Sequence, residues 1–244
     1  GWRAVFFVGA IPAILTFFIR RSIKEPEIWT KNQESGEKIS VADTFKILFS
    51  KKYASKTIIT TLMCSFCLFA YWGGFTWIPG YLAMPVEKGG AGLSIVKGLT
   101  FIIIMQCGGI IGHLTFGAIS DKIGRKKSCV IFFFMSAVLT VAYGLTRDAT
   151  WLLIMGPFLA YFGYGYYASF GVILAEIFPT NVRATGTGFA YNVGRGVSSF
   201  GPAVVGALAM QYGVGAGIAI TAVAYFFAIG MVLMLPETKG KVLE

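Results

Sequence analysis

The sequence predicts an all-α protein that is a polytopic bundle of transmembrane helices. Of its 244 residues, 56% are hydrophobic and only 13% are charged, which is too few polar residues to cover a water-soluble surface. The hydrophobic residues also gather in long runs. A membrane β-barrel would show segments of about ten residues with alternating polarity, whereas the stretch from Ile131 to Met135 is apolar throughout. We therefore expect helices.

The apolar runs predict the spans and the domain organisation. About 20 apolar residues cross the hydrocarbon core of a bilayer, and seven runs qualify or nearly do: residues 4–19, 57–82, 99–119, 129–145, 151–178, 186–212 and 217–235. The first run has neither the charged flank nor the cleavage site of a signal peptide. We predict a single helix in residues 1–19, a charged cytoplasmic linker in 20–56, a six-helix bundle in 57–235 and a cytoplasmic tail in 236–244.

The distribution of basic residues predicts the orientation of the spans. Sixteen Lys and Arg residues lie in the linker, in the loops after the third and fifth runs, and in the tail, against four on the other side. Basic residues mark cytoplasmic loops, so we expect a multi-pass plasma-membrane protein whose C-terminus is cytoplasmic. The net charge of +10 is spread between the spans, which is typical of membrane topology and excludes a nucleic-acid partner.

No residue pattern predicts catalysis, a metal or a cofactor. Cys64 and Cys67 form a CxxC pair, but they lie in an apolar run with no histidine nearby. Buried free cysteines behave as small hydrophobic residues, and we expect these to do so. We therefore predict that the protein is not an enzyme.

The loop of residues 117–127 combines small, acidic and basic residues. Gly117 stands at a helix end, Asp121 is a lone carboxylate, Gly124 permits a turn and Arg125 begins a basic cluster. Such a group can form a polar latch at the cytoplasmic rim, and it would equally suit a simple positive-inside anchor.

In register, this loop matches the G-x-x-x-D-x-x-G-R-K/R motif, so the chain resembles the major facilitator superfamily. Residues 176–183 resemble the E-x-F-P-T-x-x-R junction of that family, and residues 236–240 its P-E-T-K-G ending. The resemblance implies the second six-helix half plus the end of helix six, with a missing N-terminal half as partner. It also implies gating charge pairs at the cytoplasmic rim, formed by Asp121, Arg125, Glu176, Arg183 and Glu237.

Residues 72–81 and 186–202 are most similar to organic-acid and metabolite:proton symporters of the sugar-porter-like branch. The resemblance implies a proton-coupled carrier of a small organic anion in contact with membrane lipid. No carboxylate lies in the middle of an apolar run, so for proton-driven transport we expect the titrating acid in the absent half. The glutamine pair of hexose porters is missing from residues 67–74. A sugar or other metabolite facilitator, a membrane redox or quinone-binding protein, and a receptor of the same fold remain as alternatives.

Polar residues within the sixth apolar run are candidates for the substrate site. Asn192, Arg195 and Ser199 recur at spacings of three and four, and therefore share one helix face. Arg195 lies about 15 Å along the helix, near the bilayer centre, where an arginine needs a partner. It is either an anchor for an anionic substrate or a structural pair with the other half.

Further candidates lie on three other runs. Gln106 and His113 are seven residues apart on one face, and we predict that Gln106 contacts substrate. For His113 we predict a packed side chain, with a proton relay as the alternative. Tyr71, Trp72 and Tyr164 could line a cavity for a planar organic ligand.

Overall fold

The computed structural model describes residues 2–22 and 40–240, which form helices and no strand. Contacts divide the chain into two units, residues 1–41 and residues 42–244. Within the described residues the predicted all-α class is confirmed. Most of the predicted linker and the end of the predicted tail, residues 23–39 and 241–244, lie outside the described residues. The predicted domain boundaries therefore stay a prediction.

The first unit contains α1 (Trp2–Gly9) and α2 (Ile11–Ser22). Residues 6–19 across these two helices are apolar. The interruption at Ala10 follows from the sequence, because Gly9 weakens a helix end and Pro12 has no N–H to donate to the preceding turn.

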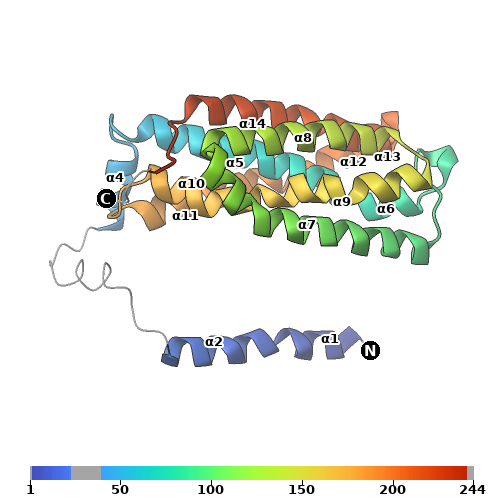
Figure 1. The fold of residues 1–244 in the computed structure, drawn as a ribbon, viewed down its shortest axis with the longest axis horizontal. Coiled ribbons are helices and arrows are strands. Elements are labelled where there is room, and N and C mark those ends of the chain that lie inside the picture. The colour runs from blue at the N-terminus through green and yellow to red at the C-terminus, as the bar shows by residue number, and fades with distance from the viewer. Residues whose placement is uncertain (1, 23–39, 241–244) are drawn as a thin grey trace. The chain divides into compact units, whose positions relative to one another are not determined.

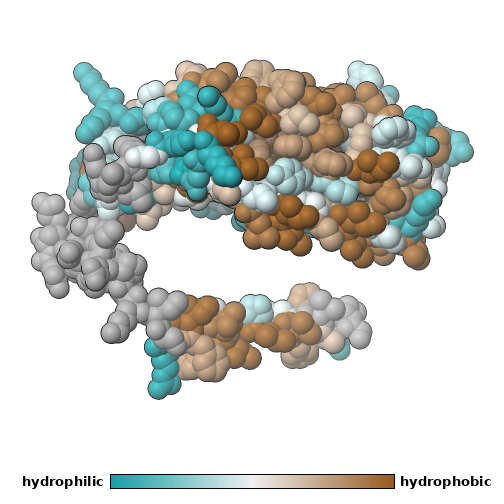
Figure 2. Space-filling model, in the orientation of Figure 1, coloured by the Kyte–Doolittle hydropathy of each residue, from teal (hydrophilic) through white to brown (hydrophobic). Residues whose placement is uncertain are grey.

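The second unit is an elongated bundle whose long helices run side by side (Figure 1). Its helices are α4 (Val41–Leu48), α5 (Ala54–Phe75), α6 (Ile78–Ala83), α7 (Ile95–Ile123), α8 (Arg125–Leu145), α9 (Ala149–Gly165), α10 (Tyr167–Ile177), α11 (Arg183–Ser198), α12 (Gly201–Tyr212), α13 (Val214–Ile220) and α14 (Ala222–Met234), with a 3₁₀ turn η1 (Val86–Lys88). Figure 2 shows hydrophobic residues along the visible flank and hydrophilic residues gathered at the ends. This is the distribution that a bilayer imposes.

Five segments are long and apolar enough to cross a membrane: Ala54–Ala83, Ile95–Ile123, Arg125–Leu145, Ala149–Ile177 and Val214–Met234. The predicted run 186–212 is not among them. Its first half, α11, contains Thr, Asn and Arg side chains and four glycines, so it is too polar to qualify. Such a helix is stable in a membrane only where its polar face meets protein or water.

In the second unit, four of the predicted continuous runs are each split into two helices, at Thr76–Trp77, at Tyr166, at Ser199–Phe200 and at Thr221. Pro79 and Pro202 lie in the first turn of α6 and α12, where a proline is tolerated but the preceding turn loses an N–H donor. At Thr221, the side-chain hydroxyl donates to the carbonyl of Ile218 at 2.7 Å and competes with the helix backbone.

Glycines let α7 and α9 approach backbone to backbone. A Cβ atom on Gly108 would lie 2.1 Å from the carbonyl oxygen of Pro157, and one on Gly112 would lie 2.1 Å from that of Tyr161. Only glycine fits such contacts. The GxxxG pair of Gly108 and Gly112 therefore serves close helix packing.

The CxxC cysteines pack inside the bundle. Cys64 and Cys67 are fully buried, and both thiols are free. A Cβ atom on Gly194 of α11 would lie 2.8 Å from Cys64, so glycine brings α11 against α5 here. Nearby, the Tyr166 hydroxyl donates to the Cys67 carbonyl at 3.0 Å. These cysteines are packed hydrophobic residues, as expected.

We expect Gly112→Ala to lower the free energy of unfolding by about 1–3 kcal/mol, because the added methyl group forces α7 away from α9. Gly117→Ala is the matched control on the same helix, since a Cβ atom there would meet nothing within 4 Å. That variant should be neutral or slightly stabilising, by about 0.5–1 kcal/mol. Thermal unfolding of the purified protein in detergent measures both. Equal midpoints for the two variants would contradict the close-contact interpretation.

Candidate functional site

A cluster of charged residues joins helix ends at one rim of the bundle, and Arg125 is its centre. The Arg125 guanidinium pairs with Glu176 of α10, with 2.9 Å between Nη2 and Oε1, and both side chains are nearly buried, at 12% and 13% exposure. It also pairs with Asp121 at the end of α7, whose side chain is 69% exposed. Arg125 Nη1 donates to the Ser120 hydroxyl at 3.1 Å.

Glu237 caps α8 from a distant part of the chain. Gly124 precedes α8 with φ +100° and has no side chain to cap it. The Glu237 carboxylate accepts instead from the backbone N–H groups of Arg125, at 2.8 Å, and Lys126, at 3.1 Å. A Cβ atom on Gly124 would lie 2.8 Å from this carboxylate. Glycine is therefore required at this position for two reasons: it adopts the positive φ angle, and it leaves room for the Glu237 carboxylate.

The protonation of Glu237 reflects these contacts. Burial raises its pKa, but backbone N–H donors from Arg125, Lys239, Lys126 and Thr238 lower it, and the net pKa lies below its usual value. Hydrogen bonds that favour the charged form act in this direction. Glu237 is thus an ionised cap at neutral pH.

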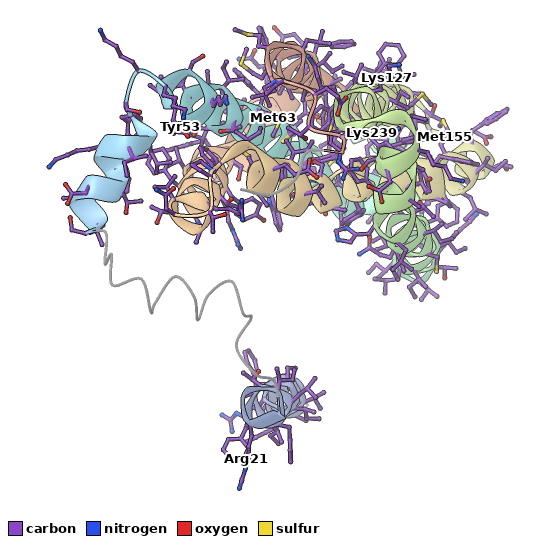
Figure 3. The ribbon with its side chains drawn as sticks, turned by 60° about the vertical axis from the view of Figure 1, so that its left-hand side comes forward. Arg21, Tyr53, Met63, Lys127, Met155 and Lys239 are labelled. Atoms are coloured by element: carbon purple, nitrogen blue, oxygen red, sulfur yellow. The ribbon has the colours of Figure 1, made fainter. Side chains whose placement is uncertain are left out.

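Two lysines complete the rim by capping the opposite ends of helices. Lys126 Nζ donates to the carbonyl of Leu233 in the last turn of α14 at 2.8 Å, and Lys239 Nζ donates to the carbonyl of Lys122 in the last turn of α7 at 2.7 Å. Cations at helix C-termini are favourable. Figure 3 labels Lys239, and also Lys127 in the first turn of α8.

The structure thus brings four of the five residues predicted for gating, namely Asp121, Arg125, Glu176 and Glu237, into one network. The fifth, Arg183, begins α11 and donates from Nε to the carbonyl of Phe178 at 3.2 Å. Sequence reasoning missed Thr238, which donates to Glu176. Its place in the P-E-T-K-G ending was the available signal.

A cluster of aromatic rings joins α5 to α9 and α10. The ring of Tyr71 lies 5.4 Å from Trp72 and 5.1 Å from Tyr164, centroid to centroid. Phe75, which was not predicted, and Tyr167, a further tyrosine of the fifth run, lie 4.6 and 5.0 Å from Tyr71. The three predicted aromatic residues are therefore together. Tyr71 is buried and Trp72 is 42% exposed, so the cluster has one accessible edge.

A small cavity of about 220 Å³ continues from this cluster. Gln106, Gly109, Ile110 and His113 of α7 line it, with Tyr164 of α9. The predicted neighbours Gln106 and Tyr164 are thus brought together. His113 differs from the expectation, because it is exposed instead of packed. The reason is that α7 packs closest to α9 through Gly108 and Gly112, and His113 lies at the edge of this contact, where one ring nitrogen reaches the carbonyl of Tyr164.

The three polar residues predicted on the sixth run lie on α11 and at its end. Asn192, Arg195 and Ser199 are all exposed. The Asn192 amide donates to the carbonyl of Gly188 at 2.8 Å, and the Ser199 hydroxyl donates to that of Gly196 at 2.7 Å. Within the described residues, no carboxylate pairs with the Arg195 guanidinium.

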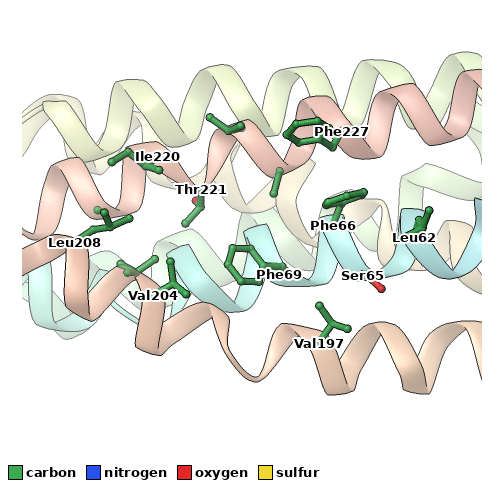
Figure 4. Close-up of a pocket in the computed structure, with 14 residues that line it drawn as sticks. Leu62, Ser65, Phe66, Phe69, Val197, Val204, Leu208, Ile220, Thr221 and Phe227 are labelled. Carbon is green, nitrogen blue, oxygen red and sulfur yellow. The ribbon is translucent and has the colours of Figure 1, made fainter.

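A second, larger cavity has different chemistry. It measures about 480 Å³, lies between α5, α11, α12 and the α13–α14 pair, and is lined by residues such as Phe66, Phe69, Val204 and Phe227 (Figure 4). Its hydroxyls, from Ser65 and Thr221, donate to carbonyls of their own helices. This larger cavity therefore suits apolar groups, and it contains no residue predicted for the substrate site.

Comparison with known proteins gives the same fold. A metabolite transport protein of Haemophilus influenzae is 33% identical over the whole chain, which covers 60% of that protein. The cis,cis-muconate transport protein of Acinetobacter baylyi is 29% identical over 93% of the chain and is covered to 54%. The chain thus spans little more than half the length of these relatives. The crystal structure of the peptide transporter POT in complex with sulfate superposes with a TM-score of 0.60 at 19% identity, covering 72% of this chain and 37% of that one.

The family model described as Major Facilitator Superfamily matches residues 1–202 and, again, residues 98–243. The two matches together cover nearly all of the chain, and the expected resemblance to the second half of the fold is confirmed. The chain belongs to the Major Facilitator Superfamily.

Proposed function

We propose that the chain forms one wall of a secondary active transporter that carries a small organic anion across the plasma membrane by alternating access, coupled to protons. Membership of the superfamily supports transport. Relatives named for cis,cis-muconate, niacin and sialic acid support a small organic acid as substrate. We further propose that an N-terminal half supplies the facing wall, and that the C-terminus is cytoplasmic.

The observation that carries the choice of an anion is the exposed guanidinium of Arg195. It lies 12 residues after Arg183, about 18 Å along α11 from the rim. An arginine at this depth costs about 2.5–3.5 kcal/mol on insertion scales. Because no described carboxylate offsets this cost, the carboxylate comes from the facing half or from the substrate. The planar guanidinium of Arg195 can donate two parallel hydrogen bonds to such a carboxylate.

The neighbours of Arg195 support a binding role. Asn192 and Ser199 each donate one hydrogen bond to their own helix and keep an oxygen that can accept another. We propose that these two residues contact the polar part of the substrate. The accessible edge of the aromatic cluster at Tyr71, Trp72 and Tyr164, with the amide of Gln106 beside it, would then contact the planar apolar part.

The rim network supports gating. We propose that Asp121, Arg125, Glu176, Arg183 and Glu237 hold the cytoplasmic ends of the spans in a fixed arrangement and that the exposed carboxylate of Asp121 contacts the facing half when the cytoplasmic side is closed. Charges at helix ends pair in one state and become solvated in the other, which is how rigid-body rocking is switched.

We expect Arg195→Ala to abolish uptake of cis,cis-muconate by the full-length transporter in vesicles. Arg195→Lys keeps the charge but cannot donate two parallel hydrogen bonds to one carboxylate, so uptake should fall at least roughly tenfold, which corresponds to about 1.4 kcal/mol. Arg147→Ala, which removes an exposed arginine from the loop before α9, is the matched control and should transport normally. All three should insert into the membrane. Unchanged muconate affinity in purified Arg195→Ala would instead assign Arg195 to a structural pair.

We expect Asp121→Asn to shift the population towards the inward-open state and to slow turnover. Loss of one exposed partner of Arg125 should change the free-energy difference between the two states by about 0.2–1 kcal/mol, which changes their population ratio by up to about fivefold. The measurement is thiol labelling of a cysteine introduced by Ala118→Cys in a Cys107→Ser background. Lys127→Gln on the same loop is the control. Wild-type labelling and transport in Asp121→Asn would leave the loop as a topological anchor.

A further inference from the structure

We propose that His113 is the protonation site that this half of the protein contributes to coupled transport. Its Nε2 takes up a proton from water when the organic anion binds nearby and returns that proton when the anion leaves. The inference rests on the proposed function, and it places one coupling group in this half in addition to any acid in the facing half.

The contact made by the other ring nitrogen defines which atom takes the proton. His113 Nδ1 lies 3.3 Å from the carbonyl oxygen of Tyr164. A carbonyl oxygen can only accept, so the contact requires the ring proton on Nδ1. In the neutral imidazole, Nε2 then has a free lone pair. Protonation adds a donor at Nε2 and a positive charge without breaking the existing contact.

The end of α9 provides an electrostatic environment that attracts a cation. Tyr164 is one residue from the end of α9 at Gly165, and its carbonyl also accepts from the backbone N–H of Tyr166. The last carbonyl groups of a helix carry partial negative charge. Interrupted helices within transporters use such carbonyl ends to hold coupling ions or protons. The break at Tyr166 therefore brings a helix end to His113 within the apolar part of the bundle.

His113 is exposed among apolar residues of α7. Ile110, one turn before it, and Leu114, the next residue, are 61% and 76% exposed. Ionisable residues at such positions in membrane spans are functional by default. The side chain lines the 220 Å³ cavity with Gln106, so the imidazole faces a space that can admit water or a ligand group.

The cavity and the proposed substrate site share the side chain of Tyr164. A Cβ atom on Gly109 would lie 2.7 Å from the Tyr164 ring, so glycine leaves the space that this ring occupies. The same ring lies 5.1 Å from Tyr71 and 5.3 Å from Phe75. A proton on His113 and an anion beside the aromatic cluster would thus share Tyr164 as a wall, and each would favour the other's binding reciprocally.

The helices packed against α7 place no charged side chain at the level of His113. From α9, the Tyr161 hydroxyl accepts from Thr115, one turn away. From α10, Tyr167 is stacked on Tyr166 and meets Tyr71.

Further titratable groups of these helices lie elsewhere. Cys129 and Tyr143 of α8 are buried, and Tyr81 of α6 contacts Thr146. Asp121, two turns along α7, and Glu176 of α10 are both paired with Arg125. The remaining groups of α7 and α8, namely Lys97, Cys107, Lys122, Lys126 and Lys127, do not line the cavity. Among the described residues that line this cavity, His113 is therefore the one that carries an imidazole.

The test uses the purified full-length transporter with cis,cis-muconate and niacin as probes. In weakly buffered solution, a pH indicator reports protons taken up as each probe binds. We expect wild-type protein to bind a probe more tightly as the pH falls from 8 to 5.5. His113→Gln keeps an N–H that can donate to the Tyr164 carbonyl, and it should bind at high pH as the wild type does. It should take up about one proton fewer per bound anion, and its affinity for the probe should depend less on pH than that of the wild type.

Two controls make the result specific. Cys107→Ala changes an exposed residue of α7 outside the cavity and should retain the wild-type proton uptake. His113→Lys keeps a charge that does not titrate between pH 5 and 8, and should bind with little pH dependence. Wild-type proton uptake and pH profile in His113→Gln would overturn this inference alone. A wild-type protein that binds neither probe would contradict the proposed function and, with it, this inference.

Discussion

The ion pair between Arg125 and Glu176 holds together the rim on which the rest of the bundle depends. Two charges that are nearly buried are stable only when paired and hydrogen-bonded, and this pair links the turn after α7 to the end of α10. The same guanidinium binds Asp121, and the backbone around it binds Glu237. Removing Arg125 would leave the nearly buried carboxylate of Glu176 without its cation, at a point where several helix ends meet.

Within the bundle, the arrangement of helices follows from where glycine permits contact. Gly108 and Gly112 direct one face of α7 to α9, and Gly194 directs α11 to Cys64 of α5. The faces that remain carry Gln106, His113 and Arg195. Polar groups are therefore exposed because close packing is used on the other sides of the same helices, and this is consistent with a wall that faces a cavity.

Much of the fold was predictable because a bilayer leaves few solutions. Long apolar runs and the asymmetry of basic residues predict spans in a definite order, and the loop containing Asp121 and Arg125 has a recognisable spacing. The breaks at Tyr166 and Ser199 were not predictable, since glycine and aromatic residues read as a continuous apolar run. The exposure of His113 also depends on which face of α7 its neighbours cover, which a single run of sequence does not contain.

The capping of α8 by Glu237 has a consequence for the order of assembly during translation. Glu237 is synthesised 112 residues after Arg125. While α9 to α14 are being made and inserted, the first N–H groups of α8 have no partner from Gly124 and are left to water at the membrane surface. Nearly the whole bundle must be synthesised before Glu237 can cap this end of α8. Capping of α8 by Glu237 is therefore among the last contacts to form during synthesis.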